Sequence, residues 1–172
     1  MSRAVAVLMV SATAAAACVV RTVTLPPLEN VAVRGFVAHA EREWPAAPSG
    51  PQTVDTLDWM VTAVESLANN RRIAVDNLSG RVRQVRGLIK EFSSMNAESL
   101  ERTRVLRRIF VDGAALIADL AFAAGTDDVD RAALRRAAES LDVNQLPRRQ
   151  SERIERYFQA ASEALQHIDR GA

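Results

Sequence analysis

The chain has 172 residues, enough for one domain with its own hydrophobic core. Its 22 basic and 21 acidic side chains nearly cancel, so no overall positive charge favours binding to nucleic acid. A single cysteine excludes a framework of internal disulfides. Aromatic residues make up only 5% of the chain, so the core must be built from aliphatic side chains, which suit closely packed helices.

The first elements in chain order are a short basic start and an uncharged run. Arg3 precedes residues 4–17, which carry no charged side chain and are followed directly by Cys18. A run of this length is typical of a secretory signal, whereas a membrane-spanning helix needs about 20 apolar residues. The sequence therefore predicts that residues 1–17 are a signal peptide.

The stretch Ala15-Ala16-Ala17-Cys18 resembles the lipobox of bacterial lipoproteins, with Ala15 where that family prefers leucine. The resemblance implies cleavage before Cys18, diacylation of its thiol and acylation of the new amine. Such acylation anchors a protein firmly, because two or three chains hold where one does not. Because Val19 rather than Asp follows, the resemblance also implies the outer membrane of a two-membrane bacterium, with the protein facing the periplasm.

Two other fates of the N-terminus are compatible with the same residues. Cleavage at an Ala-x-Ala site would leave a soluble periplasmic or secreted protein. Alternatively, Val19 and Val20 extend the apolar run to 17 residues, the lower limit of about 17 for a span, so an uncleaved segment would anchor the chain in the inner membrane.

Residues 18–51 are predicted to contain the lipid-attachment cysteine, a tether and a linker. Pro26 and Pro27 favour an extended backbone over residues 19–29, which would hold the domain away from a membrane surface. Residues 30–43 place apolar side chains on one face and predict a short helix. Residues 44–51 contain three prolines and predict a linker before a domain that spans residues 52–172.

Residues 52–92 carry the strongest helical pattern. Apolar residues alternate at spacings of three and four from Val54 to Phe92, with Arg71 as the exception. This 3.5-residue period favours one long helix packed in coiled-coil fashion. The alternative is two helices separated at residues 69–72, because asparagine favours turns and Arg71 occupies a core position.

The rest of the chain reads as three further helices joined by short turns. They are predicted over residues 97–124, from Thr126 to about Leu141, and from Pro147 to Gly171, with Asn96 capping the first. Short connections between neighbouring helices indicate antiparallel packing. The sequence therefore predicts an all-α antiparallel helical bundle of three or four main helices.

One polar stripe stands out on the helix predicted over residues 97–124. Asp112 and Asp119 are seven residues apart and share one face, which Arg104 and Arg108 extend towards the N-terminus. A buried carboxylate pair facing a ligand or metal is one interpretation of this stripe. The other is a narrow exposed strip on a central helix, in which Arg108 and Asp112 pair across one turn.

No motif for catalysis or cofactor binding was found. The two histidines, His39 and His167, do not form a His-Glu-x-x-His pair, and Gly-x-Ser-x-Gly and Ser-x-x-Lys are absent. His167 is predicted to face water, on the side of its helix opposite the apolar stripe, which argues against a haem ligand. The sequence thus predicts a protein that is not an enzyme and carries no cofactor.

The function that follows is a non-enzymatic, membrane-anchored envelope lipoprotein with a structural, scaffolding or accessory binding role. The membrane is its expected partner through Cys18, and the apolar seam of residues 52–92 either packs within the chain, engages a protein partner or mediates self-association. One alternative is a helical-bundle carrier of a small apolar ligand or lipid in the periplasm. Another is a membrane-anchored subunit of a signalling or transport complex.

Overall fold

The computed structural model describes residues 30–42, 50–126 and 129–171, and these residues form an all-α bundle. The predicted signal peptide, Cys18, the tether and most of the predicted linker lie outside the described residues. The helices are α1 (Val31–Ala40), α2 (Gly50–Asn70), α3 (Leu78–Ser94), α4 (Leu100–Ala123), α5 (Arg131–Glu139) and α6 (Ser151–Gly171), with a 3-10 turn, η1, at Pro147–Arg149. The predicted all-α fold is confirmed.

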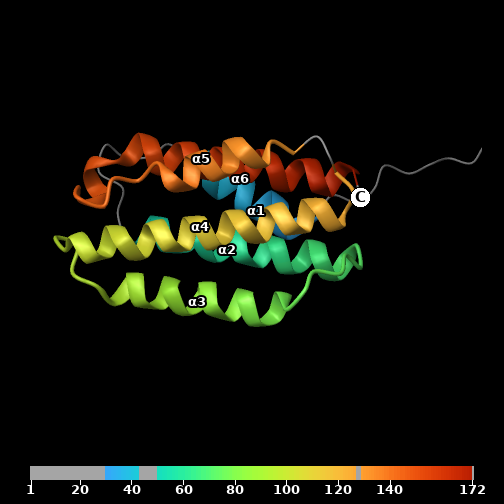
Figure 1. The fold of residues 1–172 in the computed structure, drawn as a ribbon, viewed down its shortest axis with the longest axis horizontal. Helices are drawn as coiled ribbons and strands as arrows, with labels where there is room; N and C mark the ends of the chain where they lie inside the picture. The colour runs from blue at the N-terminus through green and yellow to red at the C-terminus, as the bar shows by residue number, and fades with distance from the viewer. Residues whose placement is uncertain (1–29, 43–49, 127–128, 172) are drawn as a thin grey trace, which may run out of the picture.

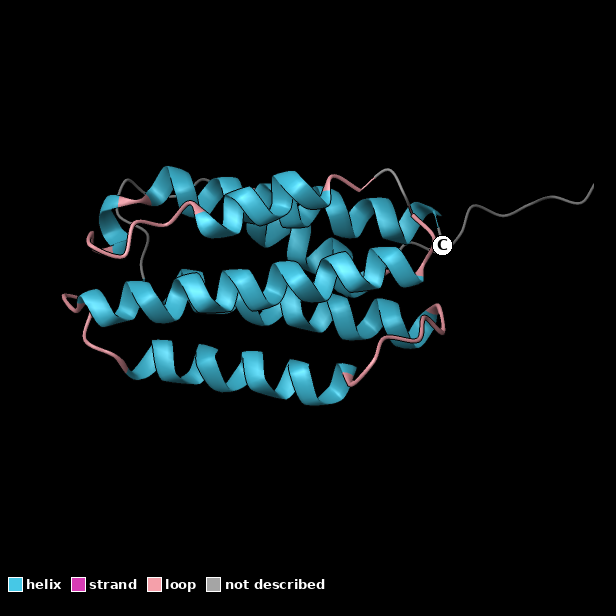
Figure 2. Cartoon of the chain, viewed as in Figure 1, coloured by secondary structure: helices cyan, strands magenta, loops and turns pink. Residues whose placement is uncertain are grey.

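The helices from α2 to α6 run alternately up and down, so sequence neighbours pack antiparallel (Figure 1). In this view α4 lies in the foreground, between α5 above it and α3 below it. Behind them, α2 contacts α3 and α4, and α6 contacts α4 and α5. Helix α1 packs against α2 and α6 at the back of the bundle, and the connections gather at the two ends of the molecule (Figure 2).

The preference for one continuous helix over residues 52–92 is wrong, and the alternative with a break is confirmed. Helix α2 ends at Asn70 and α3 begins at Leu78. Arg72 adopts a left-handed conformation with φ of 54°, and the amide of Ile73 donates to the carbonyl of Ala68 at 2.9 Å. This is the bond pattern that closes a helix C-terminus, and it occurs here without the glycine that usually marks it.

The apolar seam of the two helices packs inside the bundle. Its buried members are Leu57, Val61, Val64, Ala68, Val82, Val85, Ile89 and Phe92. The heptad pattern therefore identified core residues correctly, although the single long helix that it favoured is two helices in the structure. A chain that folds back at a turn keeps the same buried face on both helices, because each helix packs against the same core.

Aromatic rings fill the centre of the bundle. Tyr157 of α6 stacks on Phe110 of α4 with ring centroids 3.8 Å apart, and its hydroxyl donates to the sulfur of Met60 at 3.4 Å. A Cβ atom on Gly113 would lie 2.7 Å from that hydroxyl oxygen, so glycine makes the space that Tyr157 occupies. The apolar stripe of α6 is buried along its length: Ile154, Tyr157, Phe158, Ala161, Leu165 and Ile168.

Helix boundaries differ from the prediction at several places. The helix predicted from Thr126 begins only at Arg131, where Asp130 is the cap, and the Thr126 hydroxyl instead donates to the carbonyl of Ala121 at 3.0 Å. Helix α2 starts at Gly50, inside the predicted linker. Ser99, not Asn96, caps α4 through its hydroxyl oxygen, whereas Asn96 accepts from the amide of Glu98 in the preceding turn. Pro147 opens the 3-10 turn η1, and α6 begins only at Ser151.

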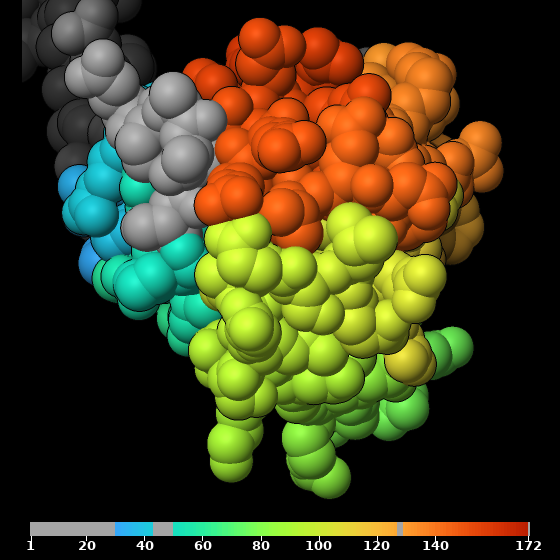
Figure 3. Space-filling view, turned by 90° about the vertical axis from the view of Figure 1, so that its left-hand side faces the viewer, coloured from blue at the N-terminus to red at the C-terminus, as the bar shows by residue number. Residues whose placement is uncertain are grey.

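One end of the bundle is closed by the connection between α5 and α6, which Figure 3 shows in orange and red above the start of α4. Gln150 organises this connection. Its side-chain amide donates to the backbone carbonyls of Asp142 and Gln145, at 2.9 and 3.0 Å. Arg148 pairs with Glu98 at 2.7 Å, which ties the connection to the turn before α4.

A buried polar junction lies at the opposite end. The carboxylate of Asp169 in α6 accepts from the backbone amide of Asn30 at 2.9 Å and pairs with the guanidinium of Arg71 at 3.2 Å. Asn30 caps α1 through its side-chain oxygen, which also accepts from the hydroxyl of Ser66 at 3.1 Å. The junction thereby links the start of α1, the body of α2, the turn after it and the end of α6.

Candidate functional site

The outer face of α4 is the most unusual surface in the described part of the chain. It exposes three large hydrophobic side chains, with exposed fractions of 41% for Leu100, 37% for Val111 and 72% for Phe122. Ala115 is also exposed and Ala118 is half-buried on the same face. Scattered apolar side chains are normal on a protein surface, but a row along one helix is typical of a contact surface.

The four residues of the predicted polar stripe lie on or beside this face. Arg104 is exposed and pairs with Glu101 one turn earlier at 2.6 Å. Arg108 is exposed as well, and Asp112 and Asp119 follow it along the side of α4 that faces α3. The structure therefore places all four on one helix, but it does not direct them towards one point.

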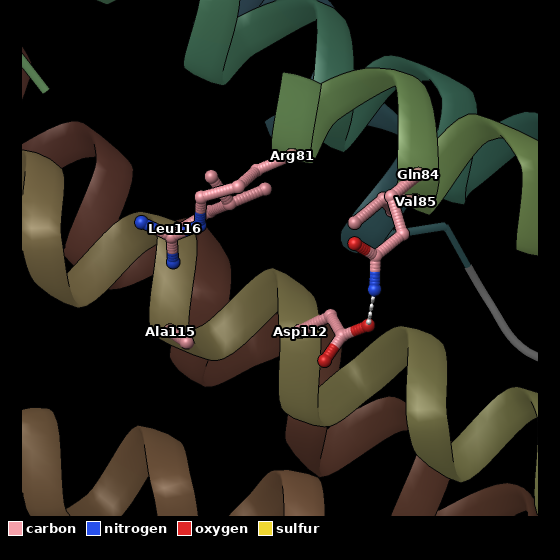
Figure 4. Close-up of a pocket in the computed structure, with 6 residues that line it drawn as sticks. All are labelled: Arg81, Gln84, Val85, Asp112, Ala115 and Leu116. Atoms are coloured by element: carbon pink, nitrogen blue, oxygen red, sulfur yellow. Dashed lines mark hydrogen bonds between the residues drawn. The ribbon is translucent and has the colours of Figure 1, made fainter. Parts of the chain in front are cut away.

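Both aspartates bridge α4 to α3, and Asp112 lines a small surface hollow of about 80 Å³ between the two helices (Figure 4). Arg81 donates to Asp119 at 2.6 Å, and the amide of Gln84 donates to Asp112 at 3.2 Å. Val85, Ala115 and Leu116 form the apolar part of the hollow. These bonds join neighbouring helices, which favours the interpretation of the stripe as a structural strip.

The arrangement offers little for catalysis or metal binding. Seven residues of helix separate the two aspartates, a rise of about 10 Å, which is too far for one ion to bridge them. Within the described ranges, no three side chains of His, Cys, Asp or Glu cluster in a way that could hold a metal. Burial raises the pKa of the nearby Tyr157 hydroxyl, and the charge of Asp112 adds to that effect, so this hydroxyl stays neutral.

On the other side of α4, an apolar groove of about 400 Å³ runs between α4 and α5. Alanine side chains from both helices and Val111 form its floor, and Arg131, Arg135 and Glu139 of α5 stand at its margin. The guanidinium of Arg131 lies 5.9 Å from the ring centroid of Phe122 at one end. The groove and the row of exposed hydrophobic residues form one continuous surface, because both include Val111.

Arg102 is a buried arginine that the sequence analysis did not single out. Its guanidinium carbon lies 4.4 Å from the ring centroid of Phe92, and Nη1 donates to the carbonyl of Met95 at 3.5 Å. Burial lowers the pKa of this guanidinium. Gly50 leaves room for it, because a Cβ there would overlap the guanidinium. These contacts pack the α3–α4 turn against the start of α2, a structural role.

The two histidines lie on different helices, α1 and α6. His39 lies in α1, where Nδ1 is 2.7 Å from the carbonyl oxygen of Gly35 and the ring is 5.3 Å from that of Trp59. His167 is exposed on α6, opposite the buried stripe, as predicted. The structure does not bring the two together with other polar groups.

Sequence reasoning missed two features, the buried junction at Asp169 and the exposed face of α4. The second had a readable signal: Val111, Ala115, Ala118 and Phe122 repeat at spacings of four, three and four. A second apolar row on a helix that already has a buried row indicates contacts on two sides. The junction had no comparable signal, because its members are spread over 139 residues.

None of the helices in the described ranges combines the length and apolar character needed to cross a membrane. In comparisons with known proteins, no family model, curated protein or solved structure matches this chain.

Proposed function

We propose that this chain is a lipid-anchored protein of the bacterial cell envelope with a structural, scaffolding or accessory binding role. The observation that carries the proposal is the N-terminal sequence, in which an uncharged run after Arg3 ends in small residues and Cys18. A lone cysteine in an exported chain would be a free thiol in an oxidising compartment, and acylation removes that liability.

The way in which the chain enters the bundle supports an anchored role. Only residues 19–29 separate Cys18 from Asn30, and eleven residues span at most about 35–40 Å. Asn30 is bonded through its amide to Asp169 and through its side chain to Ser66. A pull on the tether would therefore act on α1, α2 and α6 together rather than peel α1 away.

The packing of the interior favours a scaffold over a carrier of an apolar ligand. A carrier needs an internal space, and pockets for small molecules measure about 300–1,000 Å³. The centre of this bundle is filled by rings in contact, with Phe110 and Tyr157 stacked and Phe158 edge-on to Phe110 at 5.5 Å. The groove of about 400 Å³ lies at the surface between α4 and α5.

Mass spectrometry of the protein extracted from its host membranes tests the anchor. We expect a mature N-terminus at Cys18 that carries two or three acyl chains. Cys18→Ala should accumulate uncleaved or be released from the membrane. Ala15→Leu is the matched control, because it restores the residue that the lipoprotein pattern prefers and should be processed at least as well.

Each alternative fate predicts a different result in the same experiment. Unmodified full-length protein in the soluble fraction contradicts export altogether. A mature chain without acyl groups indicates a soluble periplasmic protein, and an intact N-terminus in the inner membrane indicates the anchored subunit. Chemical cross-linking before extraction tests the scaffolding role, since a scaffold should be recovered joined to a defined envelope component.

A further inference from the structure

The hydrophobic residues on α4 have a regular spacing. Leu100 stands eleven residues before Val111, and Phe122 stands eleven residues after it. Eleven residues are close to three turns at about 3.6 residues per turn, so the three side chains lie on one line along the helix. Among the described residues, Val31 of α1 is the one further large hydrophobic residue that is exposed.

The charges beside this line change sign at its midpoint. Arg104 lies seven residues before Val111 and Asp119 lies eight residues after it. Arg108 lies three residues before Val111 and Asp112 lies one residue after it. On the α3 edge of the face, arginines therefore precede Val111 and aspartates follow it, whereas on the α5 edge Arg131 stands beside Phe122.

We propose that this face binds a second copy of the chain, with the two α4 helices packed antiparallel about a two-fold axis at Val111. In such a pairing each residue faces one equally distant from Val111 on the other side. Leu100 then packs on the partner's Phe122, and Val111 packs on the partner's Val111. Arg104 lies within one residue of the position opposite the partner's Asp119, so these two charges meet.

The lateral positions of the charges agree with this symmetry. Asp112 and Asp119 both lie on the α3 side of α4, where they bond to Gln84 and Arg81. A two-fold axis perpendicular to both helices keeps the α3 sides of the two copies together, so the ion pairs form along one edge. A parallel pairing would instead put the α3 side of one copy beside the α5 side of the other, so these charges would lie on opposite edges and form no pairs.

The surface has room for these contacts. The side chains of Ala115 and Ala118 are short, which lets two helices approach closely, and the groove beside them extends towards α5. The partner's Arg107 falls opposite Ala115, so its aliphatic stem would cover the groove. The Asp119 side chain is 54% exposed although it pairs with Arg81, which leaves its carboxylate accessible to a second guanidinium.

Disulfide trapping of the full-length chain in its host envelope tests the symmetry. Val111→Cys should form a disulfide-linked dimer under a mild oxidant, because position 111 meets its own copy on the axis. Leu100→Cys is the matched control: it is exposed on the same face, but its own copy would be about 33 Å away along the helix. We expect its dimer yield to be about a tenth of that of Val111→Cys or less.

Charge exchange tests the register. In the Val111→Cys chain, Arg104→Asp and Asp119→Arg should each lower the dimer yield about threefold, because each places like charges opposite each other. The double variant Arg104→Asp/Asp119→Arg should restore the yield. Arg104 and Asp119 are 15 residues apart on α4 and cannot pair within one copy, so a purely local effect of either substitution would not be reversed in this way.

Removal of the apolar contact tests the affinity. Sedimentation velocity of the detergent-extracted chain should give a dissociation constant at least about tenfold higher for Val111→Glu. Val31→Glu, which changes an exposed valine on α1, should leave the dissociation constant unchanged. Circular dichroism verifies that both variants remain folded.

Several results would overturn the proposal: no dimer from Val111→Cys, equal yields at positions 100 and 111, no rescue by the double charge exchange, or trapping of a different protein. The proposal does not depend on the lipid anchor, because it uses only α4. A chain without any introduced cysteine tests the anchor separately from the dimer. Disulfide-linked dimers of that chain could form only through Cys18, and they would contradict its acylation. The trapping is then repeated with Cys18→Ser.

Discussion

Two arginine–carboxylate pairs hold the α2–α3 hairpin, and they differ in how far they are removed from water. Arg71, in the turn, pairs with Asp169 of α6, whose side chain is 3% exposed. Arg86, on α3, pairs with Glu65 of α2 at 2.6 Å, and these side chains are 46% and 32% exposed. Because Arg71 is 21% exposed, it is the Asp169 carboxylate that depends on the protein for its solvation, whereas water solvates both members of the second pair.

The difference in exposure changes what each pair contributes. A solvated ion pair contributes about 0–1 kcal/mol, because water competes for both charges. Loss of one member of a buried pair costs more, about 3–5 kcal/mol, because the remaining charge is left without solvation. Asp169 also accepts from the amide of Asn30, so its loss leaves a backbone donor unsatisfied. The exposed pair therefore contributes less to stability although its N–O distance, 2.6 Å, is shorter than the 3.2 Å of the buried pair.

The largest expected effect comes from Asp169→Ala. It removes the carboxylate that pairs with Arg71 and accepts from the backbone amide of Asn30, while the Asp169 carbonyl that also accepts from Arg71 remains, so we expect the free energy of unfolding to fall by about 3 kcal/mol. Urea denaturation followed by circular dichroism measures this loss. Asp169→Asn keeps an oxygen acceptor but not the charge, and it should fall between the wild type and the alanine variant. A change below about 1 kcal/mol for Asp169→Ala would show that the junction is solvated after all.

The next effect, of about 1–2 kcal/mol, is expected for Asn30→Ala. This change removes the oxygen that accepts from the amides of Ala32 and Val33 and from the hydroxyl of Ser66. Asn30→Ser is the control that keeps a capping oxygen and should recover most of the loss. Equal destabilisation by serine and alanine would mean that the bond to Ser66, rather than the cap, carries the effect. Thermal unfolding of the three chains distinguishes these results.

The smallest effect is expected for Arg86→Gln, which removes the exposed pair. The free energy of unfolding should change by less than about 0.5 kcal/mol. At high salt the difference between the variant and the wild type should be smaller still, because salt screens an exposed ion pair. Burial raises the pKa of the Asp58 carboxyl, while Arg86 lowers it and Asp55 raises it. Removal of Arg86 should therefore move this pKa further up, as an NMR titration would detect. Arg83→Gln, an exposed change on the same helix, is the control.

The pH dependence linked to Asp58 has a defined sign. A carboxyl whose pKa is raised in the folded state binds its proton more tightly there, so its contribution to stability is present below the unfolded pKa of about 3.9. That contribution is lost as the pH rises through the folded-state pKa. Arg86→Gln should extend the loss to higher pH, in the direction opposite to the usual acid denaturation.

Local pattern was enough to locate most helices and their buried faces. The apolar periodicity of residues 52–92 identified core residues, and Gly125, with φ of 68°, ends α4 at the predicted place. The same periodicity suggested a continuous helix, because it continues across the turn without a change of phase. The periodicity could not include the ion pair between Arg71 and Asp169, because these residues are 98 positions apart in the sequence.

The sequence by itself determined the helical class, the inward faces and an N-terminal segment that resembles a lipoprotein signal, because each of these depends on residues within a few turns of one another. Only the tertiary structure decided where the chain folds back, which aspartate is buried and which face of α4 is left uncovered. Those features depend on contacts between distant segments, and a periodic pattern is the same whether a partner helix belongs to this chain or to another.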